Sequence, residues 1–564
     1  MEKGILKISQ NKKVSFLKTF KLFLVKLLLI SSFAYASSGF HGVASRHHIA
    51  TDIGLKVLKD GGNAIDAAVA VGFALSVVNP SAGNLGGGGF MLYFDSKNNK
   101  TYALDYRERA PKAATEKMFL NDSGEVIKGL SLNSYLASAV PGTVKGMFKA
   151  HQLFGSMPME KLISPSIKIA KQGFKLSDFQ AKNFNKYKEK FLNGSDSELI
   201  FIKNEGFKEG DIFMQTDLAK TLELIKLRGQ KAFYEGKIAK QIVSDFEQND
   251  GLISFEDLLS YDVYLKDPIC GEYKEYDICS MPLPSSGGIA LIQMFNIIEN
   301  FELSDYSHNS LEYIDLLTKV MSFAYADRSK YLGDQDFFNS PVKKLTSKKY
   351  AKEIAKKINS NEVMNVEPGI YFYEGDQTTH FSVIDFEGNV VSNTYTLNTA
   401  YGSGIVAKGT GILMNNEMDD FSIKPGTPNV YGLVGSEANK IESKKSPLSS
   451  MSPTIVFKDS VPFLITGSQG GSMIINTVFQ EILNLIEFNM NLSESNKKPK
   501  IHYQWKPDIL FHEELNENLL KELSKEMKLM QRKIGETQSI AIENNQYKGW
   551  SDYRRPDGKK VEIH

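Results

Sequence analysis

The chain is poor in cysteine, with only Cys270 and Cys279 among 564 residues. This excludes a disulfide-framework protein and a zinc or iron–sulfur site built from several cysteines. Proline is also scarce, with 18 residues, which argues against extended disorder. Neither sign of charge dominates, because the chain has 67 basic and 66 acidic residues. Bulk charge therefore favours neither a nucleic-acid binder nor an acidic tail. The length predicts more than one domain.

The chain also lacks the run of about 20 apolar residues that a membrane span needs. Its N-terminal apolar run, Leu27–Phe33, follows several lysines and precedes Ala34-Tyr-Ala36. A basic segment, a short apolar stretch and a small-x-small site are typical of an export signal. We therefore expect residues 1–36 to be a signal peptide, with an uncleaved membrane anchor as the alternative. The expected location is periplasmic or secreted.

Export bears on the two cysteines, because a compartment outside the cytoplasm is oxidising. A turn at Lys274-Glu275 would place Cys270 and Cys279 opposite each other across a hairpin. A disulfide and a pair of buried thiols remain open alternatives.

The composition and the hydrophobic pattern of the chain change along its length. Residues 40–150 are rich in glycine and small side chains, residues 155–365 are mostly helical in pattern, and residues after 377 are β-like. Thr379–Asp385 and Asn389–Leu397 alternate apolar and polar residues around a Phe386-Glu-Gly388 turn, which predicts a hairpin. Residues 359–377 have no clear period and are read as a loop. Other expected elements are helices at Thr51–Leu58, 63–77, Ile289–Ile298 and Ile474–Phe488, and strands ending at Phe94, Tyr106, Phe457 and Thr466.

Several common catalytic motifs are absent. The glycine run Gly86–Gly89 lacks the Gly-Lys-Ser/Thr ending of a P-loop and leads into a strand, so close backbone packing is expected there. His47-His48 is read as a packing pair rather than a metal site. The sequence shows no His-Glu-x-x-His spacing and no Gly-x-Ser-x-Gly elbow.

A hydroxyl pair, Thr378-Thr379, opens the predicted hairpin directly after the irregular segment. A lone threonine is a weak nucleophile and needs a base beside it, which a chain terminus can supply. A free α-amine has a pKa near 8 and can take the hydroxyl proton at neutral pH.

These residues belong to a longer series of motifs: Thr378-Thr-His-Phe-Ser-Val, Asn415-Asn-Glu-Met-Asp-Asp, Pro447-Leu-Ser-Ser-Met-Ser-Pro and Gly467-Ser-Gln-Gly-Gly-Ser, preceded by Asp105-Tyr-Arg-Glu. In this order the chain resembles the γ-glutamyltransferase (γ-glutamyltranspeptidase) family of N-terminal-nucleophile hydrolases over about residues 40 to 555. The resemblance implies an α+β fold, a four-layer αββα sandwich. It also implies a heterodimer made from one self-cleaved precursor.

The resemblance further implies how the chain is divided. Cleavage between Gln377 and Thr378 would give a large subunit, 37–377, and a small catalytic subunit, 378–564. The reaction would be hydrolysis or transfer of the γ-glutamyl group of glutathione and related compounds through a γ-glutamyl-Thr378 ester. Thr396 would orient Thr378, and the backbone N–H groups of Gly470 and Gly471 would form the oxyanion hole.

Substrate recognition follows from the same resemblance. Arg107 would bind the α-carboxylate through a bidentate fork, which lysine cannot reproduce. Ser449 and Ser450 would add hydroxyl donors, while Asn398, Glu417 and Asp420 would bind the α-ammonium. Asp419 is read as a helix-cap or turn residue.

Residues 424–446 resemble the family's lid loop, in which Tyr431 would close over the pocket by bonding Asn398. Three positions depart from the family pattern. Gln469 and Tyr553 replace common prolines, and Lys500 replaces a common arginine. The change at Gln469 puts the rate or the acceptor choice in doubt, but it removes no N–H donor.

Rival functions are a cephalosporin or glutaryl acylase, a poly-γ-glutamate depolymerase and a catalytically silent binding protein of the same fold. The acidic cluster favours a glutamyl substrate over a glutaryl one, and the lid argues against a depolymerase. Expected partners are small γ-glutamyl compounds such as glutathione or glutamine, amino-acid or peptide acceptors and the chain's own two subunits. No metal, organic cofactor, nucleic acid or stable membrane span is expected.

Overall fold

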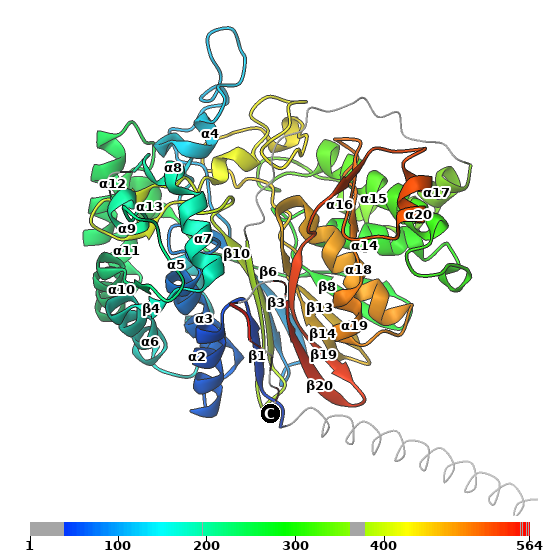
Figure 1. The fold of residues 1–564 in the computed structure, drawn as a ribbon, viewed down its shortest axis with the longest axis horizontal. Helices are drawn as coiled ribbons and strands as arrows, with labels where there is room; N and C mark the ends of the chain where they lie inside the picture. Colours follow the sequence, from blue (N-terminus) through cyan, green and yellow to red (C-terminus); the bar gives the residue numbers. More distant parts are fainter. Residues whose placement is uncertain are drawn as a thin grey trace, which may run out of the picture.

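The computed structural model describes residues 39–194, 196–360, 378–552, 554, 557–559, 561 and 563. Two antiparallel sheets lie face to face in the centre, and a layer of helices covers each outer side (Figure 1). The expected αββα sandwich is therefore confirmed. The predicted export signal lies outside the described residues, as do residues 361–377 of the predicted loop 359–377, whose first residue, Asn359, instead ends a helix.

In the first sheet, the first two strands after Thr378 lie in the interior, between strands from the N-terminal part of the chain. Its strand order is β1-β9-β10-β2-β3-β6, and every neighbouring pair is antiparallel. The strands are β1 (Gly42–Ser45), β9 (Thr379–Ile384), β10 (Val390–Thr396), β2 (Gly88–Asp95), β3 (Lys100–Tyr106) and β6 (Tyr264–Lys266). Strands from distant parts of the sequence thus alternate in one sheet.

The second sheet is built mainly from the C-terminal part of the chain. Its order is β15-β19-β14-β13-β8-β7, with β20 paired to β19. The strands are β15 (Ser468–Gln469), β19 (Glu536–Glu543), β14 (Val461–Thr466), β13 (Thr454–Lys458), β8 (Tyr276–Ser280), β7 (Ile269–Tyr273) and β20 (Gln546–Ser551). Apolar side chains such as Phe90, Ile384, Ile455 and Ile465 fill the space between the two sheets.

Each outer layer of helices places its most apolar helices directly against its sheet. On the first sheet this helix is α3 (Ala64–Val78), in which every residue is buried, and it begins with a capping box between Asn63 and Asp66. Other helices in this layer are α2 (His48–Lys59), α5 (Thr143–Phe154), α6 (Met159–Gln172), α7 (Asp178–Lys186), α8 (Lys188–Phe191), α9 (Ser197–Phe201), α10 (Thr216–Arg228), α11 (Lys231–Tyr234), α12 (Lys237–Gln248) and α13 (Phe255–Ser260).

On the second sheet the apolar helices are α14 (Gly287–Ile298) and α18 (Ile474–Ile486). They are covered by α15 (Leu311–Tyr331), α16 (Val342–Leu345), α17 (Lys348–Asn359), α19 (Leu492–Lys497) and α20 (Glu517–Leu523). Short elements complete the fold: α4 (Leu130–Asn133), β4 (Phe174–Lys175), β5 (Ile212–Phe213), β11 (Val406–Ala407), β12 (Ile412–Leu413), β16 (Ile501–His502), β17 (Leu510–His512) and β18 (Leu529–Gln531).

The glycine run before β2 packs against backbone, as its sequence predicts. A Cβ atom at Gly86 would collide with the carbonyl oxygen of Leu413, and one at Gly87 would collide with that of Thr396. The run therefore lets three chain segments approach closely. His47 is buried and stacks on His48 with ring centroids 4.6 Å apart, which confirms the packing pair.

The two cysteines form a disulfide, which decides between the two alternatives that the sequence left open. Cys270 on β7 lies opposite Cys279 on β8, and the strands turn between Tyr273 and Tyr276. Among the residues that the structure describes, no helix has the length and apolarity required to cross a membrane.

Candidate active site

A cavity of about 280 Å³ opens where the ends of the central strands meet the loops of the C-terminal half. Ten of the eleven predicted site residues line it: Arg107, Thr378, Thr396, Asn398, Glu417, Asp420, Tyr431, Ser449, Ser450 and Gly471. The eleventh, Gly470, precedes Gly471 in the chain.

The β9–β10 hairpin positions the two threonine hydroxyls that lie at one end of the cavity. Thr378 directly precedes β9, and Thr396 ends β10. Their Oγ1 atoms lie 3.3 Å apart, and Thr378 is only 3% exposed. The backbone N–H of Asn398 donates to the Thr396 Oγ1 at 2.9 Å. Because that oxygen already accepts a hydrogen bond, the Thr396 hydroxyl can direct its own proton to Thr378.

The loop after β15 contains two glycines in sequence, of which Gly471 lines the cavity. Gly470 has φ +125° and Gly471 has φ +56°, conformations that L side chains rarely adopt. A Cβ atom at Gly471 would lie 2.5 Å from the ring of Tyr431. The loop therefore requires glycine both for its backbone conformation and for its contact with Tyr431. Glycine leaves the backbone N–H groups of such a loop accessible to a developing oxyanion.

The opposite end of the cavity is built around one fully buried guanidinium. Arg107 follows β3, pairs with Glu417, and donates from Nη2 to Asp420 Oδ2 at 2.7 Å. A third carboxylate, Glu108, lies 3.5 Å from Nη1, and Nε donates to the carbonyl of Pro447 at 3.2 Å. Three carboxyl groups thus face one cation.

Burial controls the protonation of these groups. It raises the pKa of Glu108 to about 7 and that of Glu417 well above its ordinary value, although Arg107 opposes both shifts. Burial works to lower the pKa of Arg107, but the charges of Glu417, Glu108 and Asp420 outweigh it, so the guanidinium stays charged. Glu108 Oε1 and Glu417 Oε2 are buried without a hydrogen-bond partner.

The remaining predicted ligands surround this charged end. Asn398 has φ +76°, and its Nδ2 donates to the carbonyl of Asn416 at 3.0 Å. Its amide oxygen is therefore the group left for an ammonium. Ser449 Oγ accepts the N–H of Met451 at 3.1 Å, which leaves its own proton for a ligand.

Two residues of the segment 424–446, Tyr431 and Leu433, line the cavity. The Tyr431 hydroxyl donates to the backbone carbonyl of Asn398 at 2.7 Å, and Tyr431 is 4% exposed. The predicted contact between these residues is therefore present, through the main chain of Asn398. Asp419 also holds this segment, because its carboxylate accepts the N–H of Val430 at 2.9 Å and the hydroxyl of Ser131 at 2.6 Å.

The sequence reading of Asp419 as a helix-cap or turn residue is right about its backbone, which lies in the short 3₁₀ turn Glu417–Asp420, but it misses the contacts of the carboxylate. Its carboxylate bonds across to two other segments instead of capping its own turn. Burial raises its pKa to about 6. No local pattern signals this role, since Ser131 lies 288 residues away in sequence.

The sequence also missed two buried residues that support the cavity. Arg328, near the end of α15, donates to Ser286 Oγ at 2.9 Å and to Ser450 Oγ at 3.3 Å. Gln504 joins two sides of the site, because its Nε2 donates to the carbonyl of Tyr431 at 3.0 Å and its Oε1 accepts from Ser472 Oγ at 2.6 Å. Both act between distant segments, and neither stands in a recognisable motif.

A larger cavity, of about 850 Å³, lies outside this cluster, and none of the predicted site residues lines it. Arg109, Tyr261, Tyr264, Asp334 and Phe337 are among its walls. Among the residues that the structure describes, the threonine hydroxyls, the glycine loop and the arginine–carboxylate cluster come together in the smaller cavity. No group of three or more potential metal ligands was found in the described part of the chain.

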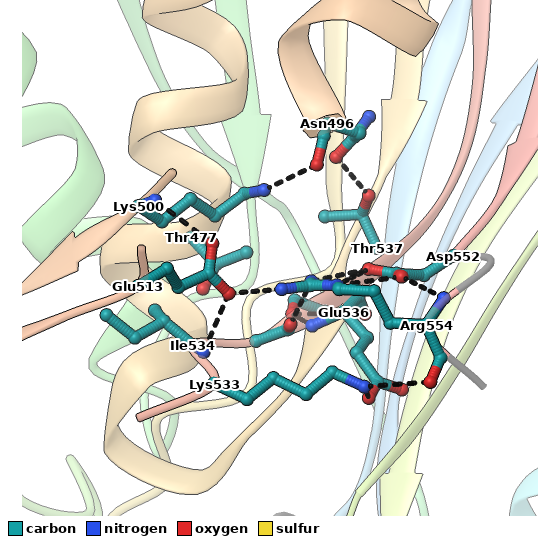
Figure 2. Close-up of polar contacts among 12 residues, drawn as sticks. Thr477, Asn496, Lys500, Glu513, Lys533, Ile534, Glu536, Thr537, Asp552 and Arg554 are labelled. Atoms are coloured by element: carbon teal, nitrogen blue, oxygen red, sulfur yellow. Dashed lines mark hydrogen bonds and ion pairs between the residues drawn. The ribbon is translucent and has the colours of Figure 1, made fainter. Parts of the chain in front are cut away.

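Two of the three positions that depart from the family pattern are described. Gln469 is buried at the end of β15 and bonds Arg46. Lys500 is buried, and its Nζ donates to the carbonyl of Asn496 at 3.0 Å, beside the ion pair of Glu513 with Arg554 (Figure 2). Tyr553 lies outside the described residues.

Comparison with known proteins gives a consistent result. A sequence model described as Gamma-glutamyltranspeptidase matches residues 50–561. The chain is 48% identical over 525 residues to a glutathione hydrolase proenzyme of Escherichia coli (strain K12), covering 91% of this chain and 90% of that protein. It is 48% identical to the solved structure of Helicobacter pylori gamma-glutamyltranspeptidase, with a TM-score of 0.54 over 55% of this chain and 90% of that one.

A further solved structure is similar to this chain in its fold only. The cephalosporin acylase of Bacillus halodurans superposes with a TM-score of 0.80 over 93% of this chain and 96% of that chain, at 24% identity.

Proposed function

Because the chain belongs to the gamma-glutamyltranspeptidase family, we propose that it hydrolyses and transfers the γ-glutamyl group of glutathione and related amides. The observation that carries this proposal is the pairing of two chemistries in one cavity. The Thr378 hydroxyl lies 3.3 Å from that of Thr396, and a buried arginine–carboxylate cluster lines the same cavity. The first can attack a carbonyl, and the second can hold an amino-acid head group.

The active form requires a break in the chain before Thr378. In the precursor, the Thr378 hydroxyl attacks the carbonyl of Gln377, and the amide nitrogen of Thr378 leaves as the new α-amine. Water then hydrolyses the resulting ester, giving subunits 37–377 and 378–564. The amine that serves as general base therefore exists only after this reaction.

Turnover then uses the same hydroxyl on a substrate. The α-amine of Thr378 takes the hydroxyl proton while Oγ attacks the γ-carbonyl, and the N–H groups of Gly470 and Gly471 stabilise the oxyanion. The leaving amine takes the proton and departs, which leaves a γ-glutamyl ester. Attack by water completes hydrolysis, whereas attack by an amino acid or peptide amine completes transfer.

Recognition depends on the opposite charges at the buried end. The substrate α-carboxylate binds Arg107 and the hydroxyls of Ser449 and Ser450. The α-ammonium binds the oxygens of Asn398, Glu417 and Asp420. In the structure Arg107 is paired with Glu417 and Asp420, so a zwitterionic head group would exchange partners with this cluster, its carboxylate pairing with Arg107 and its ammonium with the carboxylates.

We also propose that the protein is exported to the periplasm or secreted. The disulfide between Cys270 and Cys279 supports an oxidising compartment. Release of the first 36 residues on export would be seen as an N-terminus near Ser37 in protein recovered from outside the cytoplasm.

The test is release of a chromogenic amine from its γ-glutamyl amide by purified protein. We expect steady release, together with two bands on a denaturing gel. The matched glutaryl amide lacks only the α-ammonium, so faster release from it would favour the acylase alternative. Absence of release by a protein that has cut itself would overturn the proposed activity.

A further inference from the structure

The residue just before the oxyanion loop is tied down by its side chain. Gln469 ends β15, a strand of only two residues that pairs with β19 through Gln469 opposite Glu536. It is 3% exposed and precedes Gly470, whose φ is +125°. Because two glycines in the left-handed region follow, the main chain alone restricts this loop weakly.

The partner of Gln469 comes from the other sheet. Arg46 directly follows β1 and is 5% exposed. Its Nη1 donates both to Gln469 Oε1 and to Glu536 Oε2, the latter at 2.8 Å. One guanidinium thus joins the edge of the first sheet to β15, which leads into the oxyanion loop, and to β19, which pairs with β15.

Glu536 is itself fixed from a second direction. It opens β19, is 2% exposed, and pairs with Lys533, which Figure 2 shows beside it. The backbone N–H of Glu536 donates to Ser468 Oγ at 2.9 Å. An ion pair with this burial is favourable only when its geometry and hydrogen bonds are well satisfied. Glu536 is therefore held both by its side chain and by its backbone.

We propose that Arg46 is a positioning residue for catalysis, which sets the direction of the Gly470 and Gly471 N–H groups by holding Gln469 and Glu536. This inference rests on the proposed function, in which those N–H groups stabilise the oxyanion. Arg46 belongs to the proposed large subunit, whereas Gln469 and Glu536 belong to the small one. The contact thus makes the oxyanion loop depend on correct seating of the two subunits.

The same contacts account for the unusual glutamine. A proline restricts its own φ by its ring, whereas Gln469 is held by a hydrogen bond from its side chain to Arg46. The buried glutamine therefore anchors the loop by contact instead of by backbone stiffness.

The test compares Gln469→Met with the wild-type enzyme. Methionine keeps the length of the side chain but cannot accept from Arg46. A complete oxyanion donor contributes about 100-fold or more to kcat, so a displaced donor should lower kcat about 10-fold. The inhibition constant of L-glutamate, which binds the charged end, should change less than about twofold, because the ground state does not use the oxyanion loop.

The matched control is Gln293→Met on α14, which also removes a buried glutamine, 1% exposed, together with its hydrogen bond to Asp327. We expect its kcat to match that of the wild type. Arg46→Met combined with Gln469→Met should lower kcat no further than Arg46→Met alone, because both act through one contact.

A Gln469→Met enzyme with wild-type kcat would overturn the inference. So would an inhibition constant that rises in step with the fall in kcat, or a Gln293→Met enzyme with the same loss. If the wild-type enzyme releases no amine from γ-glutamyl amides, the proposed function is wrong. That result is distinct from failure of the inference about Arg46, which depends on the difference between the variants and an active wild type.

Discussion

The two ends of the cavity differ in the groups that they use, one for catalysis and the other for substrate recognition. The catalytic end uses neutral groups: two threonine hydroxyls 3.3 Å apart and the backbone of a glycine loop. The recognition end uses buried charges, with Arg107 facing Glu108, Glu417 and Asp420. Neutral donors can stabilise charge that develops during the reaction, whereas fixed charges hold a substrate that is already ionised.

This difference predicts how each end fails. Loss of a group at the catalytic end should reduce kcat, because those contacts form fully only in the transition state. Loss of a group at the recognition end should appear mainly in KM, because the head group is held throughout the reaction. The following variants separate these two behaviours.

The largest effect is expected for Thr378→Ala. The variant lacks the nucleophile for both reactions, so activity should fall by about 10⁵-fold or more, to background. A denaturing gel should show one band of the uncut precursor. Thr378→Ser retains a hydroxyl and should still yield two bands. Two bands from Thr378→Ala would show that the cut lies elsewhere.

A smaller effect is expected for Arg107→Lys. A lysine ammonium cannot bind a carboxylate through two parallel hydrogen bonds, so kcat/KM should fall about 100-fold, mostly through KM. Arg109→Lys is the neighbouring control, since Arg109 lines the other cavity and lies over the rings of Tyr261 and Tyr264. Steady-state kinetics that give both variants the same KM would contradict a recognition role for Arg107.

Tyr431→Phe should act on the cover of the cavity. It removes the hydroxyl that donates to the Asn398 carbonyl at 2.7 Å. A hydrogen bond of this kind contributes about 1 kcal/mol, so the covered state should lose about fivefold in population. We expect a larger share of hydrolysis relative to transfer, measured from the products at a fixed concentration of acceptor dipeptide. An unchanged product ratio would show that this contact does not control water entry.

The smallest effect is expected for Glu108→Gln, measured as stability against pH. Burial raises the pKa of Glu108 to about 7, so the folded wild type binds a proton that the unfolded chain has released above its ordinary pKa. The folded state is therefore favoured at low pH, and this contribution is lost as pH rises toward 7. Glutamine is neutral throughout and lacks this dependence.

The Tm of Glu108→Gln minus that of the wild type should consequently rise by about 2 °C between pH 5.5 and pH 8. Both proteins must be heated at the same rate, since large proteins often unfold irreversibly. A constant difference across this pH range would place the titration on another group.

Local sequence was sufficient for the features that depend on neighbouring residues. The alternation around Phe386 to Gly388 predicted the β9–β10 hairpin, and the spacing of Cys270 and Cys279 predicted their cross-strand pairing if they were oxidised. The family resemblance supplied the eleven site residues, ten of which line one cavity. Their catalytic and binding roles stay predictions until the variants above are measured.

Contacts between distant segments were not predictable. Arg107 and Glu417 are 310 residues apart, and Arg46 and Glu536 are 490 apart. No periodicity or motif spans such separations, because the pairing depends on how the two sheets pack. The family resemblance therefore predicted a substrate-binding role for Arg107 but not its ion pairs with Glu417 and Asp420. It also flagged Gln469 as unusual without its partner Arg46.

The order of strands in the first sheet has a consequence for how such an enzyme can be made. Strands β9 and β10 lie between β1 and β2, so each proposed subunit contributes strands that the other needs for its hydrogen bonds. Neither product could form this sheet alone. A single gene is therefore the natural arrangement, because it produces the two parts in equal number and on one chain. If the parts came from separate genes, the strands of this sheet would have to pair between two separate molecules.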